Sequence, residues 1–205
     1  MAPNCRIFPL FPSLLLFFFT FKKALAGDPD IISDFTVPQN DTVDGSFFTY
    51  TGLRGILAQN PESFKATKVT LVELPAINGQ SISYAVFQYP AGSVNPPHTH
   101  PRAAELLFLL SGCLQVGFVD TKRTLYKQTL QAGDVFIFPK GLIHYQYNPK
   151  PVPAVAIAAF GSANAGTVSV PISVFGTGID EVILAKAFKI DNDIVKKIKA
   201  GLNMS

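Results

Sequence analysis

Short apolar runs alternate with turn residues through the middle of the chain, from Lys65 to about Gly161. The runs are rich in Val, Ile, Phe and Tyr, and Gly, Pro, Asn and Asp separate them, which is the pattern of β-strands joined by tight turns. Strands are predicted over 69–74, 83–89, 106–110, 114–119, 124–130, 134–138, 143–147 and 155–160. Such regular spacing of short strands predicts an all-β sandwich or barrel.

The two ends of the chain have different patterns. Residues 27–64 are rich in turn formers with scattered aromatic residues, which predicts an irregular N-terminal arm. Residues 180–189 and 192–200 carry apolar side chains at helical spacing, and Gly201 follows as a stop signal. We therefore predict a barrel over 65–175 and a C-terminal segment of short helices over 176–205.

Residues 1–26 have the composition of a secretory signal. Arg6 precedes an apolar stretch over 8–21, and Ala24-Leu25-Ala26 is a small-residue cleavage pattern. A membrane anchor is the alternative, but the stretch is shorter than the roughly 20 residues that span a bilayer, and Pro9 and Pro12 interrupt it. The sequence predicts a secreted, extracellular protein without a membrane span.

Removal of the signal leaves a nearly neutral protein. It takes away Arg6, Lys22 and Lys23, so the 17 Lys and Arg residues fall to 14 and balance the 14 Asp and Glu residues. No stripe of basic and aromatic residues appears elsewhere, so nothing indicates a nucleic-acid partner or an anionic membrane surface.

Two further features fit an exported chain. Cys5 leaves with the signal and Cys113 remains alone, so no disulfide can form within one mature chain. Asn40-Asp41-Thr42 is a glycosylation sequon in a polar loop, which predicts a glycan on Asn40.

All three histidines fall in two short segments, 92–112 and 133–148. His98 and His100 are two residues apart, so on an extended chain both rings project to the same side. Pro101 turns the chain, and Glu105 can return to that side on the next strand, with Leu107 and Leu109 on the same face.

The second segment supplies the third histidine. Pro139-Lys140-Gly141 predicts a tight turn, and His144 follows it on the returning strand. Gln146 and Asn148 share the parity of His144 and are candidates for hydrogen bonds around a metal site.

Together, His98, His100, Glu105 and His144 predict a metal site. Burying three imidazoles and a carboxylate without a cation would cost several kcal/mol, which ligation relieves. Nitrogen and oxygen ligands of this kind suit Mn, Fe, Co, Ni or Zn, and the absence of Cys ligands disfavours a closed structural zinc site. The residue types alone leave the metal open.

The spacing of these residues resembles the two motifs of the cupin family. The first motif is matched from Gly92 through His98, His100 and Glu105 to Gly112, and the second from Gly133 to Asn148. The strings PAGSVNPPHTHPRAAEL and FGSANAGTVSVP resemble plant germin-like proteins. The resemblance implies a cupin jelly-roll barrel, Mn²⁺ on the four residues, an apoplastic or cell-wall location with a defence role, and homo-oligomers, namely hexamers built as trimers of dimers.

Departures from the family pattern bear on the substrate. The arm lacks the two cysteines that pair in many relatives. Germins with oxalate oxidase activity carry two asparagines near the ligands; Asn95 matches one as a candidate substrate-binding residue, but Ala85 stands in place of the other. A methyl group cannot donate a hydrogen bond to a carboxylate, so oxalate oxidation is disfavoured.

Three functions remain from the sequence. The leading hypothesis is manganese-dependent superoxide dismutation, with oxalate oxidation, and so a small carboxylate substrate, as the other enzyme candidate. From another class, the protein is a non-enzymatic apoplastic glycoprotein whose metal stabilises the barrel. Arg102, beside the ligands, is a candidate for steering an anion toward the site or, alternatively, an exposed turn residue or one paired at a subunit contact.

Overall fold

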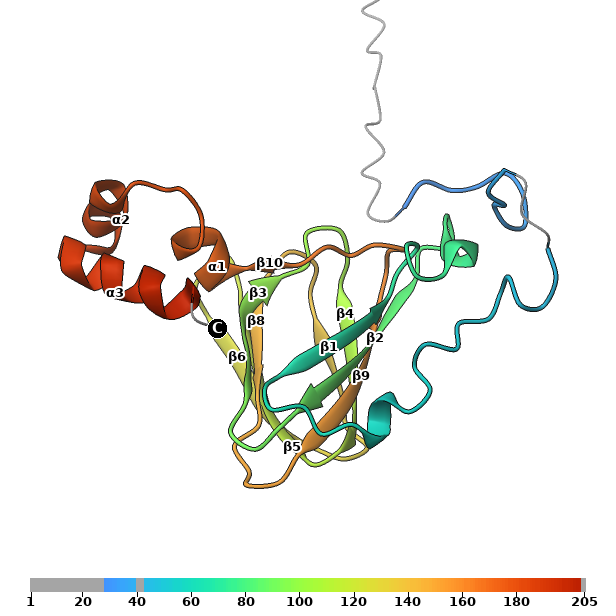
Figure 1. Cartoon of the computed structure of the whole chain (residues 1–205), viewed down its shortest axis with the longest axis horizontal. Coiled ribbons are helices and arrows are strands. Elements are labelled where there is room, and N and C mark those ends of the chain that lie inside the picture. Colours follow the sequence, from blue (N-terminus) through green and yellow to red (C-terminus); the bar gives the residue numbers. More distant parts are fainter. Residues whose placement is uncertain (1–27, 40–42, 204–205) are drawn as a thin grey trace, which may run out of the picture.

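Two antiparallel five-stranded sheets form the body of the protein (Figure 1). The computed structural model describes residues 28–39 and 43–203, so the predicted signal segment and the predicted glycosylation site at Asn40 lie outside the described residues. In Figure 1 the C-terminal helices lie on one side of the sheets and the N-terminal arm on the other. The predicted all-β barrel with short C-terminal helices is confirmed.

The sheets have the strand orders β1-β2-β9-β4-β7 and β10-β3-β8-β5-β6. The strands are β1 (Lys65–Val69), β2 (Ser83–Tyr89), β3 (Val94–Thr99), β4 (Glu105–Ser111), β5 (Cys113–Val119), β6 (Leu125–Gln131), β7 (Val135–Phe138), β8 (Ile143–Tyr147), β9 (Ala154–Phe160) and β10 (Val168–Ser169). The helices are α1 (Val170–Phe175), α2 (Glu181–Phe188) and α3 (Asn192–Asn203), with 3-10 turns η1 (Ile56–Ala58) and η2 (Pro75–Ile77).

The core lies between the sheets and is built by alternation along each strand. On β4, Leu107 and Leu109 are fully buried on the same face as Glu105, as predicted. On β9, alanines occupy the inward positions as far as Phe160. Small side chains at these positions leave room for the larger residues of the facing sheet.

The predicted strand over 69–74 is wrong in its extent, because β1 ends at Val69. Thr70 begins a turn: its backbone N–H and its hydroxyl both donate to the Glu73 carboxylate, at 2.8 and 2.6 Å, and Leu74 N donates to Thr70 O. These local hydrogen bonds compete successfully with strand pairing.

The C-terminal helices differ from the prediction in two ways. Helix α1 was not predicted, and α3 continues through Gly201, where a stop was expected. An exposed glycine inside a helix costs only about 1 kcal/mol, which neighbouring turns can offset. Leu184 of α2 and Val195 of α3 are buried, whereas Ile183 stays 60% exposed. Among the described residues no helix has the length and apolar character needed to cross a membrane.

Candidate metal centre

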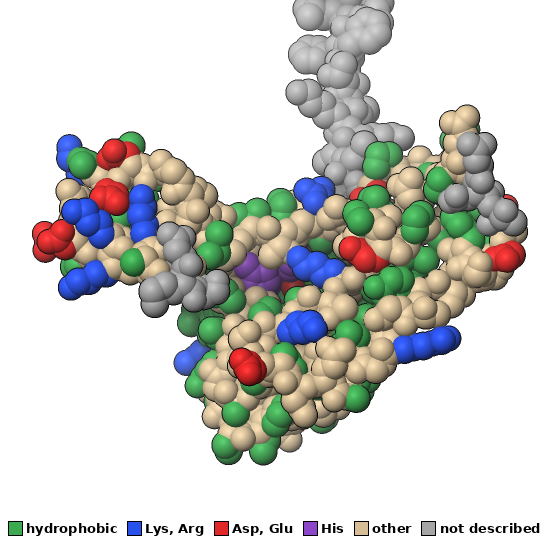
Figure 2. Space-filling model, viewed as in Figure 1, with side chains coloured by type: hydrophobic (Ala, Val, Ile, Leu, Met, Phe, Trp, Pro, Cys, Tyr) green, Lys and Arg blue, Asp and Glu red, His purple; other side chains and the backbone are tan. Residues whose placement is uncertain are grey.

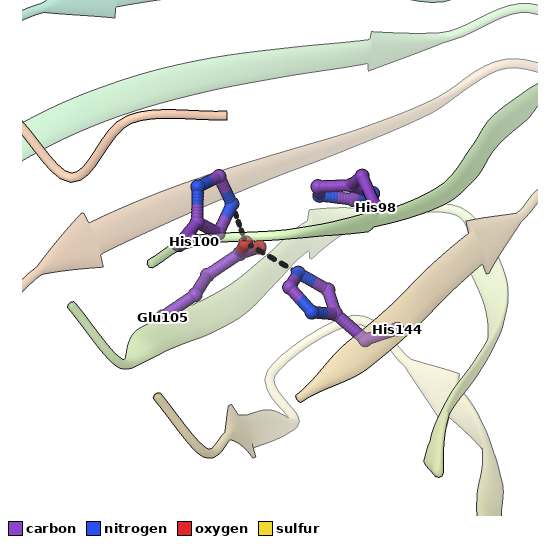
Figure 3. Close-up of side chains that lie close together, drawn as sticks. All are labelled: His98, His100, Glu105 and His144. Carbon is purple, nitrogen blue, oxygen red and sulfur yellow. Dashed lines mark hydrogen bonds and ion pairs between the residues drawn. The ribbon is translucent and has the colours of Figure 1, made fainter. Parts of the chain in front are cut away.

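The four side chains singled out in the sequence lie close together, on strands of both sheets (Figure 3). Glu105 begins β4 of one sheet, while His98 on β3 and His144 on β8 are direct partners in the other. His100 follows the last residue of β3. The site therefore depends on the two sheets being packed face to face.

An irregularity in β3 sets which residues face inward. Asn95 pairs with Gln146 and His98 pairs with His144, so β3 has one residue more than β8 between these pairs. Pro96 and Pro97 occupy this bulge, where missing N–H donors are tolerated. The bulge lets Asn95 and His98 both face the interior although they are three residues apart.

A tight turn brings His144 into place. Gly141 has φ +76°, in the left-handed region that glycine adopts readily, and Leu142 N donates to Pro139 O at 3.2 Å. Gly141 N also donates to His100 O at 3.1 Å, which ties this turn to the other ligand segment. The predicted turn over Pro139-Lys140-Gly141 is thus present.

The potential ligand atoms of the four residues all lie within 4.8 Å of one another, and all four residues are buried. Nε2 of His100 and Nε2 of His144 lie 2.9 and 3.2 Å from Oε2 of Glu105 (Figure 3). The His98 and His144 rings are 4.2 Å apart between centroids. Three imidazoles and one carboxylate thus converge on a single small volume.

Backbone carbonyls fix the tautomer of every ring. Nδ1 of His98 donates to Pro96 O at 2.8 Å, Nδ1 of His144 donates to Leu142 O at 2.9 Å, and Nδ1 of His100 donates to Gly166 O. Because a carbonyl only accepts, each Nδ1 carries its proton and each Nε2 is the atom left for a metal.

Burial and neighbouring charges shift two of the four groups. Burial, with a smaller electrostatic contribution from His144, lowers the pKa of His98 from 6.5 to about 4. Burial alone would raise the pKa of Glu105, but the hydrogen bonds that His100 and His144 make when Nε2 carries a proton outweigh it and lower the pKa to about 2. Glu105 is therefore an anion and His98 a neutral ring at neutral pH, which are the forms that bind metals.

The arrangement requires positive charge at its centre. With each Nδ1 proton committed to a carbonyl, the lone pairs of His100 Nε2 and His144 Nε2 would face the Glu105 carboxylate, and acceptors at these distances repel. Protons on Nε2 or one metal cation remove the repulsion. The donor set consequently fits a metal ion bound by three nitrogens and one oxygen.

The other sequence candidates have different surroundings. Gln146 lies beside the site and donates from Nε2 to Glu105 Oε1 at 3.1 Å, while its own Oε1 accepts from Asn95 Nδ2 at 2.6 Å. Asn148 does not reach the site, since it donates to the carbonyls of Tyr89, Pro90 and Val152. Arg102 is exposed and donates to Asn164 O from Nε at 2.6 Å.

Ala85 is fully buried in the barrel wall. It pairs with Ala158 on β9, which in turn pairs with Leu107 on β4, so these three neighbouring positions of the inner surface are apolar. On the other side of Ala85, its partner on β1 is Lys68. An asparagine at position 85 would have placed an amide there.

Sequence reasoning missed two sets of neighbours. Phe138 stacks on His144 with ring centroids 4.4 Å apart, and Phe160 contacts His100 at 4.8 Å. The connection between β9 and β10, residues 161–167, supplies the Gly166 carbonyl, and we call it the rim segment. It runs across one end of the barrel toward the helices (Figure 1). Alternation within β7 and β9 could have indicated the two rings, but nothing local marks the rim segment.

The histidines are visible from outside in a hollow between the C-terminal helices and the barrel, with Lys and Arg side chains beside it (Figure 2). A cavity of about 40 Å³ borders His100 and is also lined by Lys68, Phe160 and Thr167. This space suits a very small molecule.

Comparisons with known proteins agree with this geometry. A family model described as Cupin matches residues 57–196. Germin-like protein 9-3 of Oryza sativa subsp. japonica is 54% identical over 187 residues, which cover 87% of this chain and 87% of the relative. Germin-like protein 9-1 of the same plant is 48% identical over 192 residues, covering 91% of this chain and 78% of the relative. The solved structure of recombinant oxalate oxidase in complex with glycolate matches with a TM-score of 0.76 at 30% identity, covering 85% of this chain and 97% of that chain.

Proposed function

Because the chain belongs to the germin-like family of cupin proteins, we propose that it is a secreted manganese-binding protein that dismutates superoxide. The observation that carries this proposal is the convergence of three imidazole rings, each with Nδ1 bonded to a backbone carbonyl, and the Glu105 carboxylate on one small volume. The ligands are His98, His100, Glu105 and His144.

Manganese is proposed on two grounds. The site has borderline nitrogen donors and a hard oxygen donor but no sulfur, which is compatible with Mn²⁺ and disfavours a structural zinc. Among the metals that this donor set suits, manganese is the one that the germin resemblance implies. Four protein ligands leave positions open for a small molecule if the ion is octahedral.

Manganese, when bound, supplies one-electron chemistry by alternating between two oxidation states. The residues of the chain hold the site in shape and keep it nearly dry, because Phe138 and Phe160 cover the rings of His144 and His100. Lys68 lines the cavity beside His100, and its positive charge favours entry of an anion such as superoxide.

Oxalate is the less favoured substrate. The apolar row formed by Ala85, Ala158 and Leu107 offers no donor to a second carboxylate. Asn95, which would be its remaining amide contact, donates one of its two amide hydrogens to Gln146, so only the other is left for a carboxylate. A hydrogen bond to a charged group contributes about 1.5–3 kcal/mol, so its absence weakens oxalate binding by about ten- to a hundredfold. The similarity to a solved oxalate oxidase nevertheless makes oxalate the necessary comparison substrate.

The test is to measure superoxide and oxalate turnover by the purified protein loaded with Mn²⁺, alongside a His98→Ala variant. Superoxide turnover that disappears in the variant supports the proposal. Oxalate turnover alone would replace it with the oxidase activity. Absence of both activities, together with a metal-dependent increase in thermal stability, would favour the non-enzymatic glycoprotein.

A secreted location follows from the proposed signal at residues 1–26, and the glycan would be attached to Asn40. We place the protein in the apoplast and cell wall, with a role in defence. Expression in plant cells, followed by N-terminal sequencing and glycosidase treatment of the apoplastic fraction, tests both the cleavage and the glycan.

We further propose that the protein assembles into hexamers as trimers of dimers. Two exposed apolar surfaces support this. The outer face of β4 and β7 exposes Leu106, Phe108, Val135 and Ile137, and the C-terminal helices expose Ile172, Val182, Ile183 and Phe188. Light scattering of Phe108→Glu and Ile183→Glu variants tests the two surfaces separately, since each change should reduce the mass to a different smaller assembly.

A further inference from the structure

Asp28, among the first described residues, is joined to the rim segment by two strong hydrogen bonds. Its Oδ1 accepts from Ser162 Oγ at 2.6 Å, and its Oδ2 accepts from Ala163 N at 2.5 Å. Both bonds are to an ionised carboxylate, which makes them stronger than neutral ones.

From Ser162 the hydrogen bonds continue to the metal site. Ser162 Oγ accepts from Asn164 N at 3.1 Å, and Asn164 Oδ1 accepts from Gly166 N at 3.3 Å. The Gly166 carbonyl then accepts from His100 Nδ1. An unbroken series of hydrogen bonds therefore connects the N-terminal arm to a ring whose other nitrogen faces Glu105.

His100 depends on distant residues in a way that the other two rings do not. The carbonyls behind His98 and His144 belong to Pro96 and Leu142, two residues earlier in the chain, so local backbone geometry fixes them. The carbonyl behind His100 is 66 residues away. Its position is set only by what holds the rim segment.

We propose that Asp28 is a positioning residue for the metal centre: by clamping the rim segment, it holds the Gly166 carbonyl against His100 and so fixes the direction of Nε2. The inference rests on the proposed metal-binding function and deepens it. Under the predicted cleavage after Ala26, Asp28 would be the second residue of the mature chain. The proposal therefore gives the N-terminus of the mature chain a role in the metal site.

Contacts other than those of Asp28 also hold the rim segment in place, and this limits how far the loss of Asp28 should lower metal affinity. Arg102 donates to Asn164 O from Nε and to Ala165 O from its backbone N–H, and Leu71 N donates to Ala163 O at 2.9 Å. Loss of Asp28 therefore loosens the rim segment without releasing it. Changes to partners behind a ligand lower metal affinity by about 10- to 100-fold, and we expect the lower end, about 10-fold.

The experiment uses the full secreted chain with Asp28→Ala and with Asp30→Ala as the matched control. Asp30 is an exposed carboxylate of the same arm, two residues further on. The dissociation constant for Mn²⁺ is measured by competition with a chelator. We expect Asp28→Ala to weaken binding about 10-fold, Asp28→Asn to give an intermediate value because an amide oxygen still accepts one bond, and Asp30→Ala to match the unchanged protein.

A second readout is independent of metal. In the metal-free protein, ¹⁵N chemical shifts of His100 report which ring nitrogen carries the proton, and Asp28→Ala should mix the two tautomers while leaving His98 and His144 unchanged. An unaltered tautomer and dissociation constant in Asp28→Ala, or equal effects of Asp30→Ala, would overturn the inference. If Asp28→Ala does not fold, the Ser162→Ala variant is used instead, because it breaks the same series of hydrogen bonds. Failure of the unchanged protein to bind Mn²⁺ would instead reject the proposed function. The tautomer measurement would still show whether Asp28 fixes the orientation of His100.

Discussion

Asn95 donates one side-chain hydrogen to Gln146 Oε1 at 2.6 Å, which joins two buried amides beside the candidate metal site. Gln146 in turn donates to Glu105 Oε1 at 3.1 Å. The pair links the bulged strand to the carboxylate ligand and fixes the orientation of the carboxylate plane. The first role of the Asn95–Gln146 pair is thus to hold Glu105. Only the polar atoms of the two amides that make neither bond are free for a bound molecule.

Replacing Gln146 by Leu should weaken metal binding. The change leaves Glu105 Oε1 and the Asn95 amide without partners inside the barrel, so we expect Mn²⁺ affinity to fall by about 10- to 100-fold and the free energy of unfolding to fall by about 1–3 kcal/mol. Chelator competition and thermal unfolding measure the two effects. Gln115→Leu, at an exposed position on neighbouring β5, is the control and should alter neither quantity. Equal metal affinities for the two variants would contradict this role of Gln146.

Stability of the metal-free protein should depend on pH through His98. Its pKa is 6.5 when unperturbed and about 4 in the folded protein, so as the pH falls the unfolded chain takes up the proton first. The free energy of unfolding should therefore decrease from pH 6.5 to pH 4, by about 3 kcal/mol in total, and level off below. Urea unfolding with a chelator present checks this, and a His98→Gln variant should lack that part of the decrease. If the free energy of unfolding of His98→Gln changed with pH between 6.5 and 4 as steeply as that of the unchanged protein, His98 would not be a buried neutral ring.

Ionisation of Glu105 should make the free energy of unfolding depend on pH in a second, lower range. Its folded pKa of about 2 lies below the unperturbed 4.5, so its contribution is fully present above pH 4.5 and is lost as the pH falls toward 2. Glu105→Gln should remove this acid sensitivity while lowering Mn²⁺ affinity, because a neutral amide is a poorer ligand. Acid unfolding curves of the two metal-free proteins, compared between pH 4.5 and 2, provide the measurement. Parallel curves in that range would show that the carboxylate is not held as described.

Introducing the missing amide at position 85 should shift the substrate preference. Ala85→Asn places a hydrogen-bond donor on the inner wall, and we expect oxalate affinity to rise by about ten- to a hundredfold with some loss of stability from burying a polar group. Ala158→Asn, at the paired and equally buried position on β9, controls for burial alone. Calorimetric titration of oxalate into both metal-loaded variants and the unchanged protein gives the affinities. No difference between the variants would mean that Ala85 does not govern oxalate binding.

Gly166→Ala should cost more stability than Gly141→Ala. Both glycines have positive φ, +71° and +76°, so both substitutions carry the same backbone penalty. At position 166 a Cβ would also lie 2.8 Å from Arg102 Nη2, whereas position 141 has open space. Displacing Arg102 weakens its bonds to Asn164, so we expect an additional loss of about 0.5–1.5 kcal/mol in thermal unfolding. Equal losses would show that Arg102 moves aside without cost.

Much of the fold could be predicted because strand alternation is a local signal. The inward face of β4, with Glu105, Leu107 and Leu109, follows from parity alone. The convergence of the four ligand candidates could also be inferred, since burying three imidazoles beside a carboxylate is costly unless they share a cation. Parity also singled out Gln146 correctly, yet it failed for Asn148, because a loop carries that side chain away to backbone carbonyls.

The remaining errors have a common physical cause, namely hydrogen bonds that the sequence pattern does not encode. The turn at Thr70 is closed by Glu73, and the rim segment is placed by Asp28 and Arg102, which are far from it in the chain. The C-terminal helices differ in another way: the apolar stripe predicts a buried face, but Ile183 stays 60% exposed among the described residues. Contacts between residues far apart in the chain, such as those of Asp28 with the rim segment, become visible only in three dimensions.

The extra residue at Pro96 and Pro97 divides β3 into two parts that can change separately. If β3 kept its length but ran without the bulge, Pro96 would lie opposite Gln146 and position 95 would turn to the outside of the sheet, while the pairing of His98 with His144 would stay the same. A shift of strand register on one side of the bulge could therefore add or remove a polar side chain at the inner wall without moving the metal ligands. A short stretch of irregular strand in this way lets the residue at position 95 vary independently of the metal site.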